Sequence, residues 1–285
     1  MTVDLTWLYD RFPLLSECEP LQPGGQKWVY RCEHREIGPC VLKIIKPGAA
    51  QRLDRELEAV RRLDQLSSCN VPQVYDVGII DSQMGPLIWL LEQYVEGTDL
   101  FEVLGQSPLS RDQVLNLALD LVSVAEEAES VNVVHRDIKP RNIKIDPDGK
   151  AWLLDFGIVR ILDLESRTRS DAVVGPHSPG YSAPEQFRYQ KRAIDGRSDL
   201  FAIGVVLYES AMGVNPFIEG ARDRREVLRR VENDPLPRLE LEWDVGGLFS
   251  DFVSALTQKY PYQRPRSCTE ASHWLNDIIV QLGGL

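Results

Sequence analysis

The chain has 285 residues, 43% of them hydrophobic, which suits one large globular domain or two moderate ones. A formal net charge of −11 argues against a nucleic-acid binder, because no excess of Lys and Arg is available to neutralise phosphates. Five scattered cysteines without a Cys-x-x-Cys pair argue against a disulfide framework or a zinc site, so we expect reduced thiols and a cytoplasmic location. The most apolar run, residues 200–207, is far too short to span a bilayer, so we expect no membrane segment.

Residues 1–93 are predicted to form a small β-rich domain. Residues 1–20 are expected to be a short extension, and strand patterns follow over 21–45, 74–80 and 87–91, enough for a five-stranded sheet. Apolar residues between residues 53 and 63 recur every three or four positions, which predicts one amphipathic helix inserted between the strands.

Residues 94–285 are predicted to be mainly helical, so we place the domain boundary between residues 93 and 94. Ser110 and Gln113 have the spacing of a helix-capping box, and an apolar face follows them. Four further helices are expected over residues 200–211, 224–231, 248–258 and 269–282. We interpret the basic run of five arginines between residues 222 and 230 as a solvated helix face.

Polar side chains suited to phosphoryl transfer flank a predicted hairpin. The Pro-Asp-Gly turn at residues 147–149 lies between two short apolar strands, so a tight hairpin would bring Asp137, Lys139 and Asn142 beside Asp155. Transfer from metal-bound ATP needs one carboxylate to orient a hydroxyl, another with an amide to hold the metal, and a cation for the phosphate. The alternative for Asp137 is a turn aspartate that stabilises its own loop.

These motifs resemble those of a known family. His135-Arg-Asp137 with Asn142, Asp155-Phe-Gly157 and Ser178-Pro-Gly-Tyr-Ser-Ala-Pro-Glu185 are together similar to the eukaryotic-like (Hanks-type) serine/threonine protein kinase domain that is widespread in bacteria. The resemblance runs from about Leu21 to Leu282. It implies an α+β, bilobal fold, with a small β-rich lobe containing one helix and a larger α-helical lobe.

The resemblance also implies roles for the site residues. Asp137 would orient the substrate hydroxyl, Lys139 would neutralise the transferring phosphoryl group, and Asn142 with Asp155 would hold Mg²⁺ or Mn²⁺. Lys43 would hold the α- and β-phosphates of ATP. Its expected ion-pair partner is Glu56, with Glu58 as the competitor. The other residues expected to bind the nucleotide are Gly24, Gly25, Val29, Gln93, Val95 and Asp99.

The chain departs from the family at two places near the nucleotide. Gln22 and Lys27 stand at two glycine positions of the phosphate-covering loop, where side chains would hinder close approach of backbone N–H groups or contact a phosphate directly. Glu92 lies at or next to the adenine pocket, where a buried carboxylate is costly unless paired. Either Glu92 turns away from the pocket, or it finds a cation, or the alignment with the family is shifted by one residue. Asp99 reaches the ribose or caps the next helix.

The remaining landmarks are architectural or regulatory. Ser178 occupies the family's threonine position in this segment, Glu185 is expected to pair with Arg264, and Asp199 is expected to support the catalytic loop. Arg136 is typical of kinases switched on by phosphorylation, and the candidate sites are Thr168 and Ser170. The alternative for that segment is a merely flexible polar loop.

We therefore expect a serine/threonine protein kinase that transfers the γ-phosphoryl group of ATP to protein hydroxyls and autophosphorylates. One alternative is a pseudokinase or ATP-binding scaffold, which the altered glycine loop and Glu92 favour. Another is a kinase for a small molecule, which the Ala-Pro-Glu segment disfavours. Protein substrates are the expected partners. The sequence leaves open which substrates, which oligomeric state, and whether the chain belongs to a longer protein.

Overall fold

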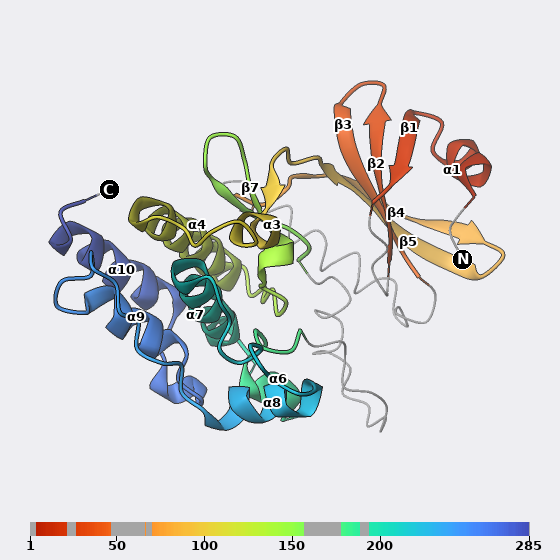
Figure 1. The fold of residues 1–285 in the computed structure, drawn as a ribbon. Coiled ribbons are helices and arrows are strands. Elements are labelled where there is room, and N and C mark those ends of the chain that lie inside the picture. Colours follow the sequence, from red (N-terminus) through yellow and green to blue (C-terminus); the bar gives the residue numbers. More distant parts are fainter. Residues whose placement is uncertain are drawn as a thin grey trace. The chain divides into compact units, whose positions relative to one another are not determined.

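The computed structural model describes residues 4–21, 27–46, 66, 70–156, 178–188 and 194–284 (Figure 1). The chain divides into two compact units, Met1–Ser67 with Pro72–Val95 and Ser68–Val71 with Glu96–Leu285. The predicted boundary between residues 93 and 94 lies two residues before the point where the chain enters the second unit. No helix in the described ranges combines the length and apolar character needed to cross a membrane.

The first unit is built on an antiparallel five-stranded sheet with the order β1-β2-β3-β5-β4. Its elements are α1 (Leu5–Arg11), β1 (Leu15–Pro20), β2 (Lys27–His34), β3 (Gly38–Ile45), β4 (Val74–Ser82) and β5 (Gly85–Gln93). The predicted helix over residues 53–63 lies outside the described residues. β4 and β5 confirm the two strands expected over residues 74–80 and 87–91.

The first strand begins at Leu15, inside the segment expected to be an extension. Its period-two pattern is hidden in the sequence because the pairing of β1 with β2 is irregular between Ser16 and Glu19. Glu17 there adopts a left-handed backbone, with a φ of 49°. A bulge inserts an extra residue, so Leu15 and Cys18, three positions apart, are both buried.

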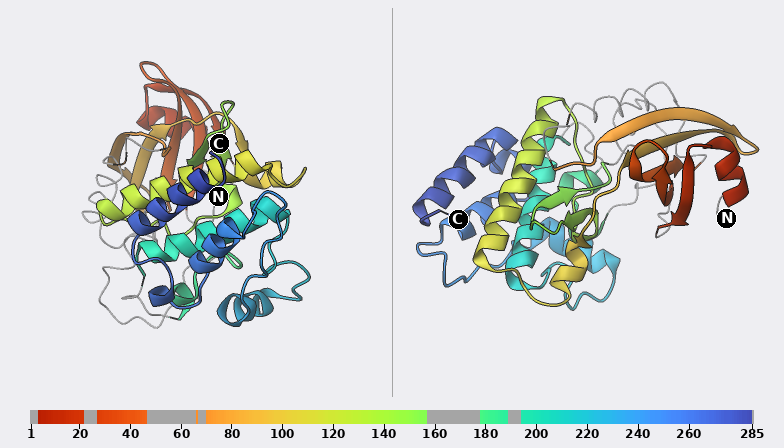
Figure 2. Two further views of the ribbon diagram at one scale, coloured as in Figure 1. Left: turned by 90° about the vertical axis from the view of Figure 1, so that its left-hand side faces the viewer. Right: turned by 90° about the horizontal axis from the view of Figure 1, so that it is seen from above.

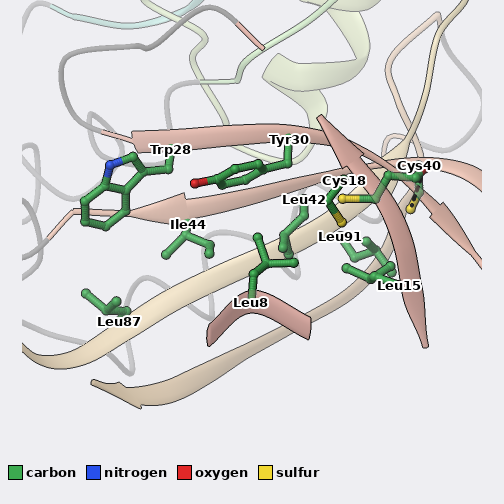
Figure 3. Close-up of a cluster of buried hydrophobic side chains, with 11 residues drawn as sticks. Leu8, Leu15, Cys18, Trp28, Tyr30, Cys40, Leu42, Ile44, Leu87 and Leu91 are labelled. Atoms are coloured by element: carbon green, nitrogen blue, oxygen red, sulfur yellow. Dashed lines mark hydrogen bonds between the residues drawn. The ribbon is translucent and has the colours of Figure 1, made fainter. Parts of the chain in front are cut away.

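One face of this sheet carries a hydrophobic cluster to which α1 contributes Leu8 and β1 contributes Leu15 and Cys18 (Figure 3). Alternate residues of β2 contribute Trp28, Tyr30 and Cys32, as expected for a strand with one buried face. Leu8 of α1 is completely buried, and Figure 3 shows its side chain beside Leu42 of β3. The N-terminal segment is therefore part of the core of the first unit.

The second unit is mainly helical and carries a three-stranded sheet, β6-β7-β8. Its elements are β6 (Thr98–Asp99), α3 (Leu100–Leu104), α4 (Arg111–Ser130), the 3₁₀ turn η2 (Pro140–Asn142), β7 (Ile143–Ile145), β8 (Ala151–Leu153), α6 (Pro184–Phe187), α7 (Gly196–Met212), α8 (Arg224–Asn233), α9 (Leu248–Leu256), the 3₁₀ turn η4 (Pro261–Gln263) and α10 (Cys268–Gln281). The four helices expected in this half are confirmed, with bounds shifted by a few residues.

Helix α7 lies at the centre of the second unit, where it packs against α4 and α9, while α10 packs against α4 (Figures 1 and 2). Helix α7 carries apolar residues on all sides, and all of its residues from Leu200 to Tyr208 are buried. Gly204 allows the close approach of α9, because a Cβ there would lie 2.6 Å from Cγ2 of Thr257. The capping box of α4 is confirmed, with the Ser110 N–H donating to Oε1 of Gln113 at 2.9 Å.

The predicted solvated face is helix α8 and the residues before it. Arg222 and Arg230 both pair with Glu226, at 2.9 and 3.0 Å, and Arg229 pairs with Asp234 at 3.2 Å. Four of the five arginines are exposed to solvent, and the fifth, Arg230, is half-buried. This confirms the interpretation as a solvated face.

Candidate active site

The loop that carries Asp137 is held by a buried carboxylate on α7. Oxygen Oδ2 of Asp199 accepts from the His135 N–H at 2.7 Å, and Oδ1 accepts from the Arg136 N–H at 2.8 Å. Burial raises the pKa of Asp199 to about 6, although these two backbone donors favour the ionised form. Above that pH the carboxylate can accept both hydrogen bonds. The predicted supporting role of Asp199 therefore has a direct geometric basis.

Arg136 adopts a left-handed backbone, with a φ of 65°, which is unfavourable for a residue with a Cβ. Its N–H is bound by Asp199, and its C=O accepts from Nε2 of Gln186 at 2.9 Å. Residues outside the loop thus fix both backbone groups of Arg136. The strained turn directs the next residue, Asp137, toward Lys139 and Asn142.

Three polar side chains meet at Asp137. Lys139 Nζ lies 3.0 Å from Oδ2 of Asp137 and donates to Oγ of Ser178 at 2.9 Å. The Ser178 hydroxyl donates to Oδ1 of Asp137 at 2.7 Å. Asn142 Nδ2 donates to the backbone C=O of Asp137 at 2.8 Å and lies 3.3 Å from its Oδ2. The predicted grouping of Asp137, Lys139 and Asn142 is therefore present in the structure.

The hairpin predicted between the two motifs is confirmed by β7 and β8, which pair Ile143 with Leu153. The next residue continues the pairing, since the Leu154 N–H donates to the Asn142 C=O at 2.8 Å. Asp155 follows directly, in a left-handed conformation with a φ of 62°. The hairpin thus brings the chain back beside Asn142, and Asp155 is the next residue after this contact.

A ring contact also joins the two motifs. Nε2 of His135 donates to the Leu154 C=O at 2.9 Å, while Nδ1 accepts from the Asp137 N–H at 3.2 Å. These bonds require the neutral imidazole with its proton on Nε2. The ring of Phe156 packs edge-on against His135, with centroids 4.6 Å apart. His135 therefore serves as a structural bridge.

The side chains of Asn142 and Asp155 suit a hard divalent cation. The amide nitrogen of Asn142 is engaged by Asp137, so its Oδ1 lies on the other side of the amide, as an oxygen that Mg²⁺ accepts. In the described ranges, no group of three or more His, Cys, Asp or Glu side chains could hold a metal alone. A metal bound here would therefore need further oxygens, such as those of a nucleotide phosphate.

A buried ion pair lies in the same unit. Nη1 and Nη2 of Arg264 contact Oε1 and Oε2 of Glu185 at 2.6 and 3.0 Å, with 0% and 1% of the two side chains exposed. Ser198 Oγ also donates to Oε1 of Glu185 at 2.7 Å. The predicted pair is thus present as a two-pronged contact that ties α6 to the segment before α10.

Lys259, which the sequence did not single out, is half-buried, and its Nζ atom is shielded from solvent. Its Nζ lies 4.5 Å from the ring centre of Phe217 and 5.6 Å from that of Phe201. It has no hydrogen-bond partner in the part of the chain that the structure describes. Burial lowers its pKa to about 8. The ammonium form is therefore costly for the folded state.

In the first unit, Lys43 lies on β3 and its ion-pair partner is Glu92 on β5. Both side chains are buried, with 8% and 10% exposed. Of the three alternatives for Glu92, the structure favours the one in which it finds a cation. The pairing predicted with Glu56 or Glu58 involves residues outside the described ranges.

The other predicted nucleotide contacts are placed only in part. Val29 lies on β2 directly opposite Lys43, and Gln93 and Val95 lie at and after the end of β5. Asp99 stands at the N-cap position of α3 without a capping hydrogen bond from its side chain, which removes support for the capping alternative. Lys27 begins β2. Gln22, Gly24, Gly25, Thr168 and Ser170 lie outside the described residues.

Comparison with known proteins agrees with these motifs. The protein kinase domain model matches residues 19–275. The chain is 31% identical over 242 residues to serine/threonine-protein kinase PknB of Mycobacterium leprae, covering 83% of this chain and 38% of the relative. It is 29% identical over 273 residues to PknB of Mycolicibacterium smegmatis, covering 92% and 42%. It is 30% identical over 261 residues to pkn3 of Myxococcus xanthus, covering 86% and 46%.

The chain spans less than half the length of each of these relatives. The family match covers most of the chain and includes the catalytic loop, the hairpin after it and the buried ion pair. The chain therefore belongs to the protein kinase domain family.

Proposed function

We propose that the chain is a serine/threonine protein kinase domain, which transfers the γ-phosphoryl group of ATP to a hydroxyl of a protein substrate. The observation that carries this proposal is the group formed by Asp137, Lys139, Asn142 and Ser178. The similar proteins named above are serine/threonine kinases, which supports the same conclusion.

The geometry around Asp137 suits a hydroxyl acceptor. The Ser178 hydroxyl donates to Oδ1 of Asp137 at 2.7 Å, so an aliphatic hydroxyl can approach this carboxylate at hydrogen-bond distance. Lys139, at 3.0 Å from the other carboxylate oxygen, places a cation where negative charge develops during transfer. Positioning and electrostatics supply most of the catalysis in this reaction class.

Asn142 and Asp155 are the residues that would hold Mg²⁺ or Mn²⁺, with Lys43 binding the α- and β-phosphates. The bound metal would neutralise the phosphate oxygens during transfer. The protein's own part is to keep Asn142 fixed by its bond to the Asp137 C=O, and to deliver Asp155 at the end of the hairpin.

Cys18, Cys32, Cys40 and Cys268 are free thiols, which supports a cytoplasmic location.

The test is transfer of labelled phosphate from ATP to a general protein substrate, with Asp137→Asn as the variant. We expect turnover to fall by about 10²- to 10⁴-fold, the range for a lost general base, while ATP binding stays intact. Asp148→Asn is the matched control, because Asp148 is an exposed carboxylate in the nearby hairpin turn. Equal phosphorylation by wild type and Asp137→Asn would refute the assignment.

Autophosphorylation at Thr168 or Ser170 belongs to the same proposal. Mapping phosphates after incubation with ATP and Mg²⁺, then with Mn²⁺, tests it. Full activity without any phosphate on this segment would contradict the regulatory role.

A further inference from the structure

The ion pair between Lys43 and Glu92 is built into the sheet. On β3 and β5, Lys43 lies opposite Leu90, and Val41 lies opposite Glu92. Because side chains alternate between faces, Lys43 and Glu92 share one face as diagonal neighbours, a spacing that two long side chains can bridge. The pairing therefore follows from the strand register.

The surroundings make this pair different from a surface ion pair. Val29 and Leu90 lie directly opposite Lys43 on the two adjacent strands. By contrast, Arg31 and Glu33 on β2 are 3.9 Å apart, with 42% and 35% of their side chains exposed. A charge as buried as Lys43 needs a nearby opposite charge, and Glu92 supplies one.

The strands also restrict where the ammonium can go. Five consecutive residue pairs, from Cys40 with Gln93 to Ile44 with Trp89, align β3 and β5. Both carbon stems therefore start from fixed backbone positions. An ammonium has three N–H donors, so a lysine can contact a carboxylate and a phosphate oxygen at the same time.

We propose that Glu92 is a positioning residue for Lys43, which holds the ammonium on this face of the sheet in the place where it receives the phosphates of ATP. The inference rests on the proposed function, because it takes Lys43 as the phosphate-binding cation. In this role Glu92 needs no contact of its own with the phosphates or the acceptor hydroxyl. Its effect on the nucleotide passes through Lys43.

The test is a double-mutant cycle on nucleotide binding, using a non-hydrolysable ATP analogue with Mg²⁺ and the whole chain. We expect Glu92→Gln to weaken binding by about 10-fold when Lys43 is present, as for loss of one well-placed charged contact. In the Lys43→Met background the same change should alter binding by less than about 2-fold, because Glu92 then has nothing to position. An equal loss in both backgrounds, or tighter binding by Glu92→Gln, would overturn the proposal.

Two further variants keep the result interpretable. Glu92→Asp retains the charge with one methylene less, and should give an intermediate loss that also disappears with Lys43→Met. If Glu92→Gln does not fold, Glu92→Asp replaces it in the double-mutant cycle. Glu33→Gln removes a solvated carboxylate from the same sheet and should leave binding unchanged.

The outcome separates this inference from the proposed function. If wild type binds the analogue and phosphorylates protein, but the Glu92 variants bind equally well, only the positioning role fails. If wild type binds no nucleotide, both fail. If the cycle holds while Asp137→Asn keeps full turnover, the nucleotide site stands and the catalytic assignment fails.

Discussion

Glu185→Gln is the sharpest test of how the helical unit is held together. Glu185 accepts from both terminal nitrogens of Arg264, at 2.6 and 3.0 Å, and from Ser198 Oγ at 2.7 Å. A glutamine presents an N–H₂ group in place of one oxygen, so one guanidinium N–H loses its acceptor. The guanidinium charge, with 0% of the side chain exposed, also loses its counter-ion.

The expected cost follows from these two losses. A hydrogen bond to a charged group contributes about 1.5–3 kcal/mol, and an uncompensated buried charge raises the total to about 3–5 kcal/mol. At roughly 2–4 °C per kcal/mol for a domain of this size, the unfolding temperature of the helical unit should fall by about 6–20 °C. Thermal unfolding followed by the helical circular dichroism signal measures this change.

The matched control is Asp251→Asn, which removes a surface pair. Asp251 lies 3.0 Å from Arg238, about the same distance as in the pair of Glu185 and Arg264. In the surface pair, however, 61% of the Asp251 side chain and 65% of the Arg238 side chain are exposed. We expect a cost of only about 0.2–1 kcal/mol there. The double variant Glu185→Leu with Arg264→Met should recover much of the loss, since it leaves no buried charge unpaired. A cost for Glu185→Gln no larger than the control would refute the reasoning.

Three further changes test other parts of the second unit. Ser178→Ala should lower turnover, because it removes the hydroxyl that donates to Asp137, while Ser178→Thr should retain it; steady-state phosphorylation measures both. Gly204→Ala should destabilise the chain by about 1–3 kcal/mol in denaturant unfolding, because the added methyl group would clash with Thr257. Lys259→Met should raise the unfolding temperature at pH 7, and its advantage should shrink as the pH rises from about 8 to 10.5.

The sign of the pH effect follows from proton binding. The pKa of Lys259 is about 8 in the folded protein against an ordinary value of 10.5, so between these values the unfolded chain binds more protons. Wild-type stability from this group therefore rises with pH across that window. Lys150→Met, at an exposed position, is the control and should show no such trend. A constant advantage of Lys259→Met at every pH would contradict the pH argument. Full turnover in Ser178→Ala would contradict the role given to the Ser178 hydroxyl. An unchanged stability of Gly204→Ala would contradict the predicted clash with Thr257.

The catalytic group was predictable because its members are close in sequence. Asp137, Lys139 and Asn142 belong to one loop, and a Pro-Asp-Gly turn returns the chain to Asp155, so local rules suffice to bring them together. The supports from farther away, Asp199 and the pair of Glu185 with Arg264, came from the resemblance to the kinase family. Their geometry could not be derived from spacing alone.

The pair of Lys43 with Glu92 shows what sequence reasoning could not reach. Its residues are 49 positions apart, and β3 pairs with β5 rather than with β4, the next strand in the described part of the chain. Neither the partner strand nor the register is readable from an apolar strand pattern. The first strand was placed too late for a different reason, because the bulge at Glu17 breaks the alternation on which strand prediction depends.

The contribution of α1 and β1 to the hydrophobic cluster has a practical consequence for expressing this domain. The family match begins at residue 19, after Leu8, Leu15 and Cys18, so a fragment cut at the family boundary would lack three buried members of the cluster. The remaining members of the cluster, such as Leu42, would lose part of their cover, and β2 would lose most of β1, one of its two neighbouring strands. An uncovered apolar face beside an open strand edge favours aggregation. The boundary of a soluble fragment is therefore set by the packing of Leu8 rather than by the catalytic motifs.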